Sequence, residues 1–156
     1  MKTAIIKYNA GNIQSVAFAL ERLGREGVIT DDPKQIENAD KVIFPGVGEA
    51  SSAMRFLEEK GLDRVIKNLR QPVLGICLGL QLMCEFSEEN HTQCLNLFPV
   101  KVKRFDTNLK IPHVGWNQIF DLRSPLFEGI EEGSFVYFVH SYFAELNQYT
   151  IAGPES

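Results

Sequence analysis

Gly75-Ile76-Cys77-Leu78-Gly79 is the stretch that decides the fold of this chain of 156 residues. It follows a short apolar run, Pro72-Val73-Leu74, and precedes a helical pattern from Leu80 to Cys84. This order predicts a strand, a sharp turn with a cysteine at its corner, and a helix. The glycines suit such a turn because side chains on either flank of the corner would collide with neighbouring backbone.

Cys77 is a candidate nucleophile because of this position. The layout is that of the G-x-S-x-G elbow of hydrolases, with sulfur in place of oxygen. A thiol at the corner lies at a helix N-terminus, where unpaired N–H groups and the helix dipole favour an anion. We therefore expect the pKa of Cys77 to be lowered. The alternative is a buried structural thiol, and this is how we interpret the other two cysteines, Cys84 and Cys94.

The rest of the chain alternates between apolar strands and helices up to Glu85. Strands are predicted over 3–8, 28–30, 41–44 and 72–74, and helices over 13–23, 33–39, 50–60 and 62–69. Continuous apolar strands between helices indicate an α/β fold with a largely parallel open sheet covered on both faces.

The pattern changes after Glu85. Residues 86–93 are polar and are predicted to form a loop, whereas 98–105, 115–120 and 134–143 read as strands of a mixed or antiparallel extension. The aromatic run over 135–143 is expected to lie mainly in the core. We find no linker, so the chain is predicted to be a single domain over 1–156.

Composition restricts the classes of function. A net charge of −4 argues against nucleic acid and against an anionic membrane as partners. No apolar stretch is long enough to span a bilayer, and the N-terminus lacks a signal-peptide pattern. Three cysteines without a C-x-x-C pair favour a reducing cytoplasm. The three histidines, His91, His113 and His140, lack metal-ligand spacing, so we expect no metal site.

Pro45-Gly46-Val47-Gly48 is the second candidate element of a site. It ends one predicted strand, as Cys77 ends the next in sequence. Because ligands bind at the carboxyl ends of parallel strands, we expect N–H groups of this loop to lie beside Cys77. Acyl transfer needs such donors for the developing oxyanion. The alternative is an ordinary β-turn. A phosphate-binding loop does not fit, because the G-x-x-x-x-G-K-S/T pattern is missing.

Four motifs together identify a family. They are Pro45 to Gly48, Gly75 to Leu82, Pro112-His113-Val114-Gly115-Trp116-Asn117 and Tyr137-Phe138-Val139-His140-Ser141-Tyr142. In this order they resemble the class I (triad-type) glutamine amidotransferases, and the P-H-x-G-W-N motif narrows the resemblance to the glutaminase subunits of imidazole glycerol phosphate synthase. The resemblance covers about residues 3–152 and implies the flavodoxin-like class I amidotransferase fold.

The resemblance also implies a reaction. In this family the cysteine attacks the side-chain amide of glutamine, ammonia leaves, and water hydrolyses the resulting thioester. Ammonia then passes to a (βα)8-barrel cyclase partner of histidine biosynthesis. The residues that match family positions are Cys77 as nucleophile; Val47, Gly48 and Leu78 around the oxyanion; Gly46, Gln81, Glu89, Ser141 and Tyr142 in the glutamine pocket; and Pro112, Trp116 and Asn117 against the partner.

One family motif has no full counterpart. The family's general base is a histidine in a Q-F-H-P-E-K/R-S motif, whereas this sequence reads Ala152-Gly153-Pro154-Glu155-Ser156, with glycine where histidine is expected. The C-terminal part of the fold is expected to be missing, the general-base histidine is not found, and Glu155 is the one candidate for the triad glutamate. A truncated chain, an omitted internal segment and a natural fragment all fit. Since losing a general base costs roughly 10²–10⁴-fold, a chain ending here should have negligible glutaminase activity.

Other functions stay open at this point. The chain could be a non-catalytic interaction subunit, or a paralogue that docks on an ammonia-dependent synthase of another pathway. An elbow-cysteine protein of the glyoxalase or deglycase type is a further alternative, against which the glutamine-pocket and P-H-x-G-W-N motifs count.

Overall fold

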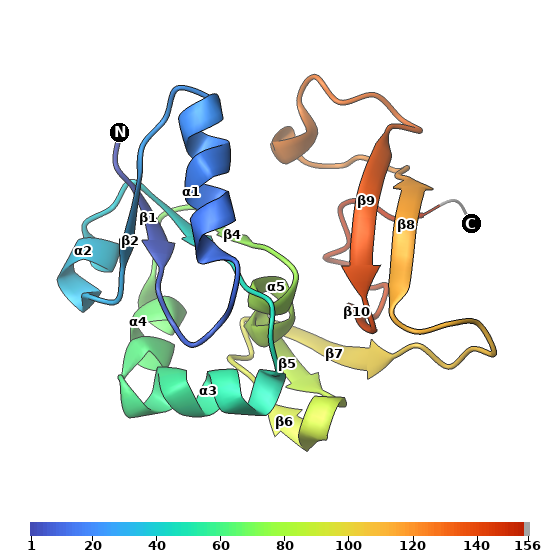
Figure 1. Ribbon diagram of the computed structural model, residues 1–156, viewed down its shortest axis with the longest axis horizontal. Coiled ribbons are helices and arrows are strands. Elements are labelled where there is room, and N and C mark those ends of the chain that lie inside the picture. Colours follow the sequence, from blue (N-terminus) through green and yellow to red (C-terminus); the bar gives the residue numbers. More distant parts are fainter. Residues whose placement is uncertain (155–156) are drawn as a thin grey trace. The chain divides into compact units, whose positions relative to one another are not determined.

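The computed structural model describes residues 1–154 and separates into two compact units, Met1–Val102 and Lys103–Ser156. Figure 1 shows the order of their elements along the chain. The single domain expected over 1–156 stays a prediction.

The centre of the first unit is a sheet of four parallel strands in the order β2-β1-β3-β4. The strands are β1 (Thr3–Ile6), β2 (Gly27–Thr30), β3 (Lys41–Phe44) and β4 (Val73–Gly75). Ala4 lies opposite Val42, and Ile43 lies opposite Leu74. The predicted parallel α/β sheet is therefore confirmed.

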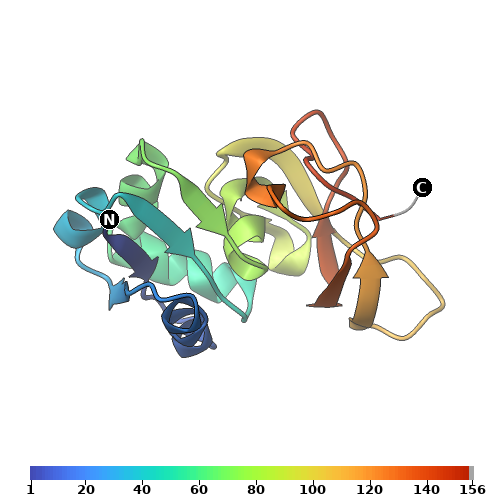
Figure 2. The same ribbon diagram turned by 90° about the horizontal axis from the view of Figure 1, so that it is seen from above.

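Helices cover both faces of this sheet, as Figures 1 and 2 show. They are α1 (Ile13–Arg22), α2 (Pro33–Glu37), α3 (Ala50–Glu59), α4 (Leu62–Asn68) and α5 (Leu78–Met83). Side chains alternate between the two faces of each strand. Ile5 and Ile43 accordingly pack with Ala17 of α1, while Ile6 and Phe44 pack into the larger cluster with residues of the other helices.

Local signals set the helix ends in this unit. Asp32 caps α2, because its carboxylate accepts a hydrogen bond of 2.9 Å from the N–H of Lys34, and Pro33 occupies the first turn. Gly61 follows α3 with φ 68°, a conformation that glycine adopts without strain.

Residues 84–93 correct one prediction. The expected loop over 86–93 contains strand β5 (Cys84–Ser87), a 3₁₀ turn η1 (Glu89–His91) and strand β6 (Thr92–Gln93), and β5 pairs with β7 (Phe98–Arg104). The polar pattern was misleading because two of its polar residues are buried. Ser87 accepts a hydrogen bond from the N–H of Glu89, and the hydroxyl of Thr92 donates to the carbonyl of Glu89.

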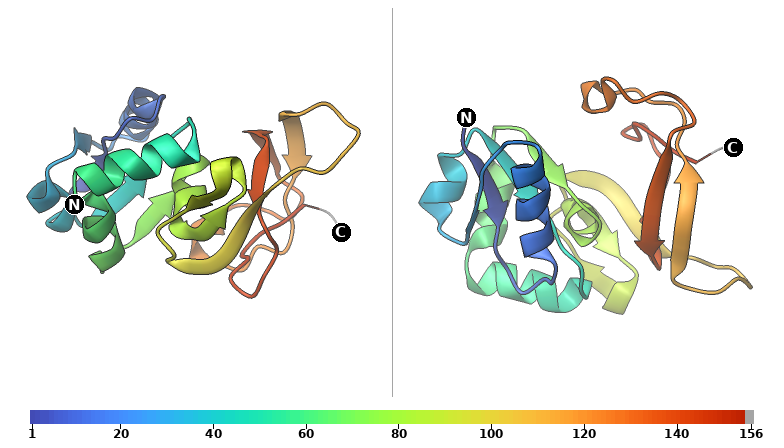
Figure 3. Two further views of the ribbon diagram at one scale, coloured as in Figure 1. Left: turned by 90° about the horizontal axis from the view of Figure 1, so that it is seen from below. Right: turned by 45° about the horizontal axis from the view of Figure 1, so that its top comes forward.

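The second unit is built on an antiparallel pair of strands, β8 (His113–Gln118) and β9 (Phe135–His140), seen from two directions in Figure 3. The predicted strand over 134–143 is interrupted at Ser141 and resumes as β10 (Tyr142–Ala144). The expected burial of the aromatic run is wrong for one face of the pair: Phe135, Tyr137 and Val139 are all more than half exposed. The alternation of side chains along a strand predicts which of them share a face of the sheet, but it does not predict which face is buried.

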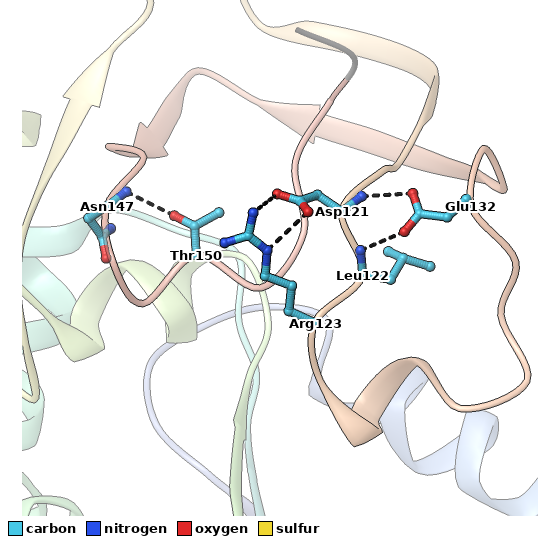
Figure 4. Close-up of polar contacts among 6 residues, drawn as sticks. All are labelled: Asp121, Leu122, Arg123, Glu132, Asn147 and Thr150. Atoms are coloured by element: carbon cyan, nitrogen blue, oxygen red, sulfur yellow. Dashed lines mark hydrogen bonds and ion pairs between the residues drawn. The ribbon is translucent and has the colours of Figure 1, made fainter.

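A polar cluster orders the loops of the second unit (Figure 4). The carboxylate of Glu132 accepts hydrogen bonds of 2.7 and 2.8 Å from the N–H groups of Asp121 and Leu122. Arg123 pairs with Asp121, and the N–H of Asn147 donates to the hydroxyl of Thr150. The short turn η2 (Pro125–Phe127) lies within the first of these loops. Among the residues described, no helix combines the length and apolar character needed to cross a membrane.

Candidate functional site

Cys77 stands at the corner between β4 and α5, with φ 50° and ψ −111°. Such a positive φ is strained for a residue with a side chain. A Cβ at Gly75 would lie 2.8 Å from Cα of Leu80, and one at Gly79 would lie 1.8 Å from the carbonyl oxygen of Phe44. The tight frame around the elbow therefore requires glycine at both positions, as the sequence predicted.

The loop after β3 lies directly beside this elbow. The N–H of Ile76 donates a hydrogen bond of 2.9 Å to the carbonyl of Phe44, and the N–H of Leu78 donates one of 3.2 Å to the carbonyl of Gly46. The structure thus brings together the two loops that the sequence selected, at the carboxyl ends of neighbouring parallel strands.

One of the expected oxyanion donors is engaged by the loop itself. The Gly46 carbonyl occupies the Leu78 N–H, one of the two expected oxyanion donors. Val47 is half exposed, and its own carbonyl accepts a hydrogen bond of 3.0 Å from the N–H of Gly11. Gly46 and Gly48 have φ of 143° and 148°, a region open to glycine. In this conformation of the loop, the Gly46 carbonyl therefore occupies the position where the Leu78 N–H would bind an oxyanion.

Tyr8 holds the same loop through a hydrogen bond. This side chain follows β1, is 5% exposed, and donates a hydrogen bond of 2.5 Å from its hydroxyl to the carbonyl of Pro45. Its pKa is raised, first by burial and then by the charge of Cys77. Three loops, after β1, β3 and β4, consequently meet around Cys77.

The electrostatics of Cys77 correct the expected lowering of its pKa. Partial burial raises the pKa of the thiol and the charge of Glu89 adds to the rise, while a hydrogen bond from the N–H of Leu78 opposes it. The helix that follows is only six residues long, and its first N–H is shared with the Gly46 carbonyl. Cys77 is nevertheless exposed, whereas Cys84 and Cys94 are buried.

Besides Gly46, two candidates for the glutamine pocket lie in the first unit. Gln81 is on α5, half-buried, and its N–H bonds the Cys77 carbonyl at 3.0 Å. Glu89, in η1, accepts a hydrogen bond of 2.9 Å from the N–H of Ala50 at the start of α3. Its charge contributes to the raised pKa of Cys77. Burial, followed by the charge of Glu49, raises the pKa of Glu89 itself.

The other candidates lie in the second unit. The carbonyls of Ser141 and Tyr142 accept hydrogen bonds from the N–H of Phe105 and from Nδ1 of His140. Trp116 is 66% exposed and packs edge-on against Tyr137, with ring centroids 5.3 Å apart. Pro112, after a cis peptide bond, precedes β8, and Asn117 accepts a hydrogen bond of 2.7 Å from Nε2 of His113. Glu155 lies outside the described residues.

Sequence reasoning missed Tyr8, Glu49 and Asn90. Glu49 could have been found as an acidic residue just before a predicted helix, a position that favours helix capping. Tyr8 and Asn90 left no such signal, since their partners Pro45 and Glu49 are distant in sequence.

Comparison with known proteins identifies the family of this chain. The family described as "Glutamine amidotransferase class-I" matches residues 5–152. This chain belongs to the class I glutamine amidotransferases. It is an amidotransferase-type enzyme subunit, and the resemblance seen in its motifs is confirmed.

Several relatives are similar in sequence to nearly the whole of this chain. A protein of Bacteroides fragilis named "Imidazole glycerol phosphate synthase subunit HisH" is 59% identical, and the alignment covers 97% of this chain and 79% of the relative. Proteins of the same name from Bacteroides thetaiotaomicron and Haemophilus influenzae are 58% and 50% identical, covering 97% and 95% of this chain and 79% and 75% of the relatives.

The fold is shared with a solved amidotransferase. A structure titled "Crystal structure of glutamine amidotransferase" superposes with a TM-score of 0.77 at 17% identity, over 97% of this chain and 79% of that one. This agreement confirms the predicted class I amidotransferase fold.

Proposed function

We propose that this chain hydrolyses glutamine at Cys77 through a thioester and supplies the ammonia to a (βα)8-barrel cyclase, which forms imidazole glycerol phosphate in histidine biosynthesis. Family membership and the names of its relatives support a role in this pathway. The observation that carries the chemistry is the position of an exposed, strained Cys77 beside the glycine loop 45–48.

The thiolate of Cys77 attacks the side-chain amide carbon of glutamine, and the carbonyl π electrons move to oxygen. Collapse of this tetrahedral species expels ammonia once a proton has reached its nitrogen, and leaves the γ-glutamyl thioester. Water then attacks the thioester, so glutamate leaves and the thiol is restored. Backbone N–H groups that face the oxyanion stabilise both steps, each worth about 3–4 kcal/mol in comparable enzymes.

Oxyanion stabilisation requires the loop to change. The N–H of Leu78 is one donor, and it must exchange the Gly46 carbonyl for the substrate oxygen. Rotation of the peptide group between Gly46 and Val47 would turn that carbonyl away from Leu78 and point the N–H of Val47 inward. Gly48 would be the hinge on the other side of Val47. Because Gly46 and Gly48 have no side chain, such a rotation meets little steric resistance.

The glutamine pocket is assigned by charge and position. The Glu89 carboxylate, whose charge acts on the Cys77 thiol, is proposed to bind the α-ammonium group of glutamine. Gly46 and Gln81 would line the same pocket, and the roles of Ser141 and Tyr142 in glutamine binding stay predictions from the family resemblance. The described residues 1–154 supply no assigned general base, and the chemistry needs no metal or organic cofactor.

The proposed partner interface includes Pro112, Trp116 and Asn117. An exposed tryptophan paired with a tyrosine has the character of an interface hot spot. We propose a heterodimer with the cyclase in the cytoplasm, with ammonia passing between the subunits without release.

The test is to trap Cys77 with a glutamine analogue bearing a diazo-ketone, in the presence of saturating cyclase and with imidazole added as an external base. We expect one label on the peptide that contains Cys77, competition by glutamine, and no label in Cys77→Ser. Absence of labelling, with cyclase binding intact, would contradict glutamine hydrolysis and favour a non-catalytic interaction subunit.

A further inference from the structure

Glu89 sits in a turn that is fixed from its backbone. Its N–H donates a hydrogen bond of 3.2 Å to the hydroxyl of Ser87, and its carbonyl accepts one of 2.7 Å from the hydroxyl of Thr92. Ser87 is fully buried and Thr92 is 7% exposed, so both anchors belong to the core of the first unit. These bonds hold the main chain, but they leave the direction of the Glu89 side chain to its other contacts.

Glu49 supplies a contact from 41 residues away in sequence. Its Oε1 accepts a hydrogen bond of 2.8 Å from Nδ2 of Asn90, the residue next to Glu89. The same carboxylate caps α3, with bonds of 2.7 and 2.8 Å from the N–H groups of Ser51 and Ser52. Asn90 has a left-handed backbone with φ 52°. The bridge therefore ties the tip of the η1 turn to the start of α3.

The two carboxylates share the N-terminus of α3. Glu89 takes the N–H of Ala50, and Glu49 takes the next two. A helix N-terminus favours negative charge, so both groups gain from this position although they repel one another. Glu89 thus has its Oε2 fixed on Ala50 and its neighbouring residue fixed on Glu49. Glu89 is therefore an oriented carboxylate on which the negative charge of Glu49 also acts.

We propose that Glu49 and Asn90 are positioning residues that hold Glu89 for the α-ammonium group of the substrate. The hydrogen bond between Glu49 and Asn90 would then set how much more tightly the site binds glutamine than an analogue of glutamine that lacks the α-amine. This inference rests on the proposed function, because it takes Cys77 as the nucleophile and Glu89 as the ammonium partner. Glu49 acts through Asn90 and the helix end.

Two variants distinguish the effect of losing the Glu49–Asn90 hydrogen bond from the effect of a general loss of stability. In Asn90→Gly the left-handed backbone is retained and only the donor to Glu49 is lost. In Glu49→Asp the side chain remains a good helix cap, but it is too short to keep both the cap and the bond to Asn90. A purely structural role for Glu49 would be rescued by aspartate, whereas the positioning role would not.

The experiment measures protection of Cys77 from alkylation by iodoacetamide, using the chain with its cyclase partner and reading the modified peptide by mass spectrometry. Glutamine is compared with glutaramic acid, which is glutamine without its α-amine. Each variant is normalised to its own alkylation rate without ligand. Glu59→Asp, at the far end of α3, is the matched control.

We expect both bridge variants to raise the half-protecting concentration of glutamine by about tenfold, the effect of weakening one charged contact. The half-protecting concentration of glutaramic acid should stay unchanged in the variants. Unchanged glutamine protection in Asn90→Gly and Glu49→Asp would overturn the positioning role while leaving the proposed function standing. If glutamine fails to protect even the unmutated chain, the proposed function itself is contradicted, and the inference with it.

Discussion

The hydroxyl of Tyr8 donates a hydrogen bond of 2.5 Å to the carbonyl of Pro45, and this hydroxyl would also lie 2.1 Å from a Cβ added at Gly46. One buried oxygen thus both holds the loop after β3 and fills the space where a side chain at its first glycine would go. With Tyr8 in this position, residue 46 has no room for a side chain.

The first prediction tests this close fit between Tyr8 and Gly46. Tyr8→Phe leaves a buried carbonyl unpaired and should cost about 1–3 kcal/mol of unfolding free energy. Gly46→Ala should cost a similar amount through the clash and through its φ of 143°. The double variant should lose less unfolding free energy than the two single variants lose together, because phenylalanine lacks the oxygen that clashes with the new Cβ. Denaturant unfolding of all four proteins measures the coupling, and simple additivity would contradict it.

The second prediction concerns the elbow. Gly79→Ala would place a Cβ 1.8 Å from the carbonyl oxygen of Phe44, a backbone atom that cannot rotate away. We expect a loss of about 3 kcal/mol or more as α5 moves off β3. Gly115→Ala is the matched control, since a Cβ there meets no atom within 4 Å. A thermal melt that shows equal Tm values for the two variants would be inconsistent with this packing.

The third prediction follows from the raised pKa of Cys77. The thiolate is the reactive form, so alkylation by iodoacetamide should be slow at neutral pH and should accelerate as pH rises past the ordinary value of 9.0 for a cysteine. Glu89→Gln removes a charge that raises this pKa and should move the rate profile to lower pH. Peptide mapping keeps Cys77 apart from Cys84 and Cys94. A profile unmoved by the substitution would mean that the two groups are not coupled.

The fourth prediction concerns acid stability. Burial raises the pKa of Glu49, but hydrogen bonds from Ser51, Ser52 and Asn90 outweigh that effect and lower it from 4.5 to about 2. A depressed pKa stabilises the fold above the unfolded value, and this contribution disappears as pH falls from about 4.5 to about 2. The stability gap between the unmutated chain and Glu49→Gln should shrink over this range. Glu59→Gln, at the other end of α3, should show no comparable change of gap in urea titrations.

The fifth prediction tests the exposed ring of Trp116. Trp116→Ala should change the Tm little, because the side chain is 66% exposed, but it should weaken cyclase binding by about 2 kcal/mol or more if the ring is a hot spot. Phe18→Ala, at a half-exposed position on α1, is the control. Binding measured by calorimetry that responds equally to both substitutions would speak against an interface at Trp116.

The sequence was informative where structure follows from local pattern. The strand at Lys41–Phe44 and the helix from Ala50 to Glu59 were predicted within a residue, because apolar spacing and end signals are properties of neighbouring residues. The segment 84–93 was not predicted, since its polar residues Ser87 and Thr92 are buried and satisfied by the backbone of Glu89.

The site shows the same division. The closeness of the elbow to the glycine loop followed from strand order, but the direction of the Gly46 carbonyl did not, because glycine adopts either orientation of the peptide. The rise in the pKa of Cys77 depends on burial and on Glu89, which only the folded chain brings near. The link between Glu49 and Asn90 spans 41 residues and has no sequence signature.

The unequal exposure of the three thiols has a practical use. Since Cys77 alone among them is open to solvent, a single environment-sensitive fluorophore can be coupled to the natural sequence without removing other cysteines. Its emission would report rearrangements of the neighbouring glycine loop in real time.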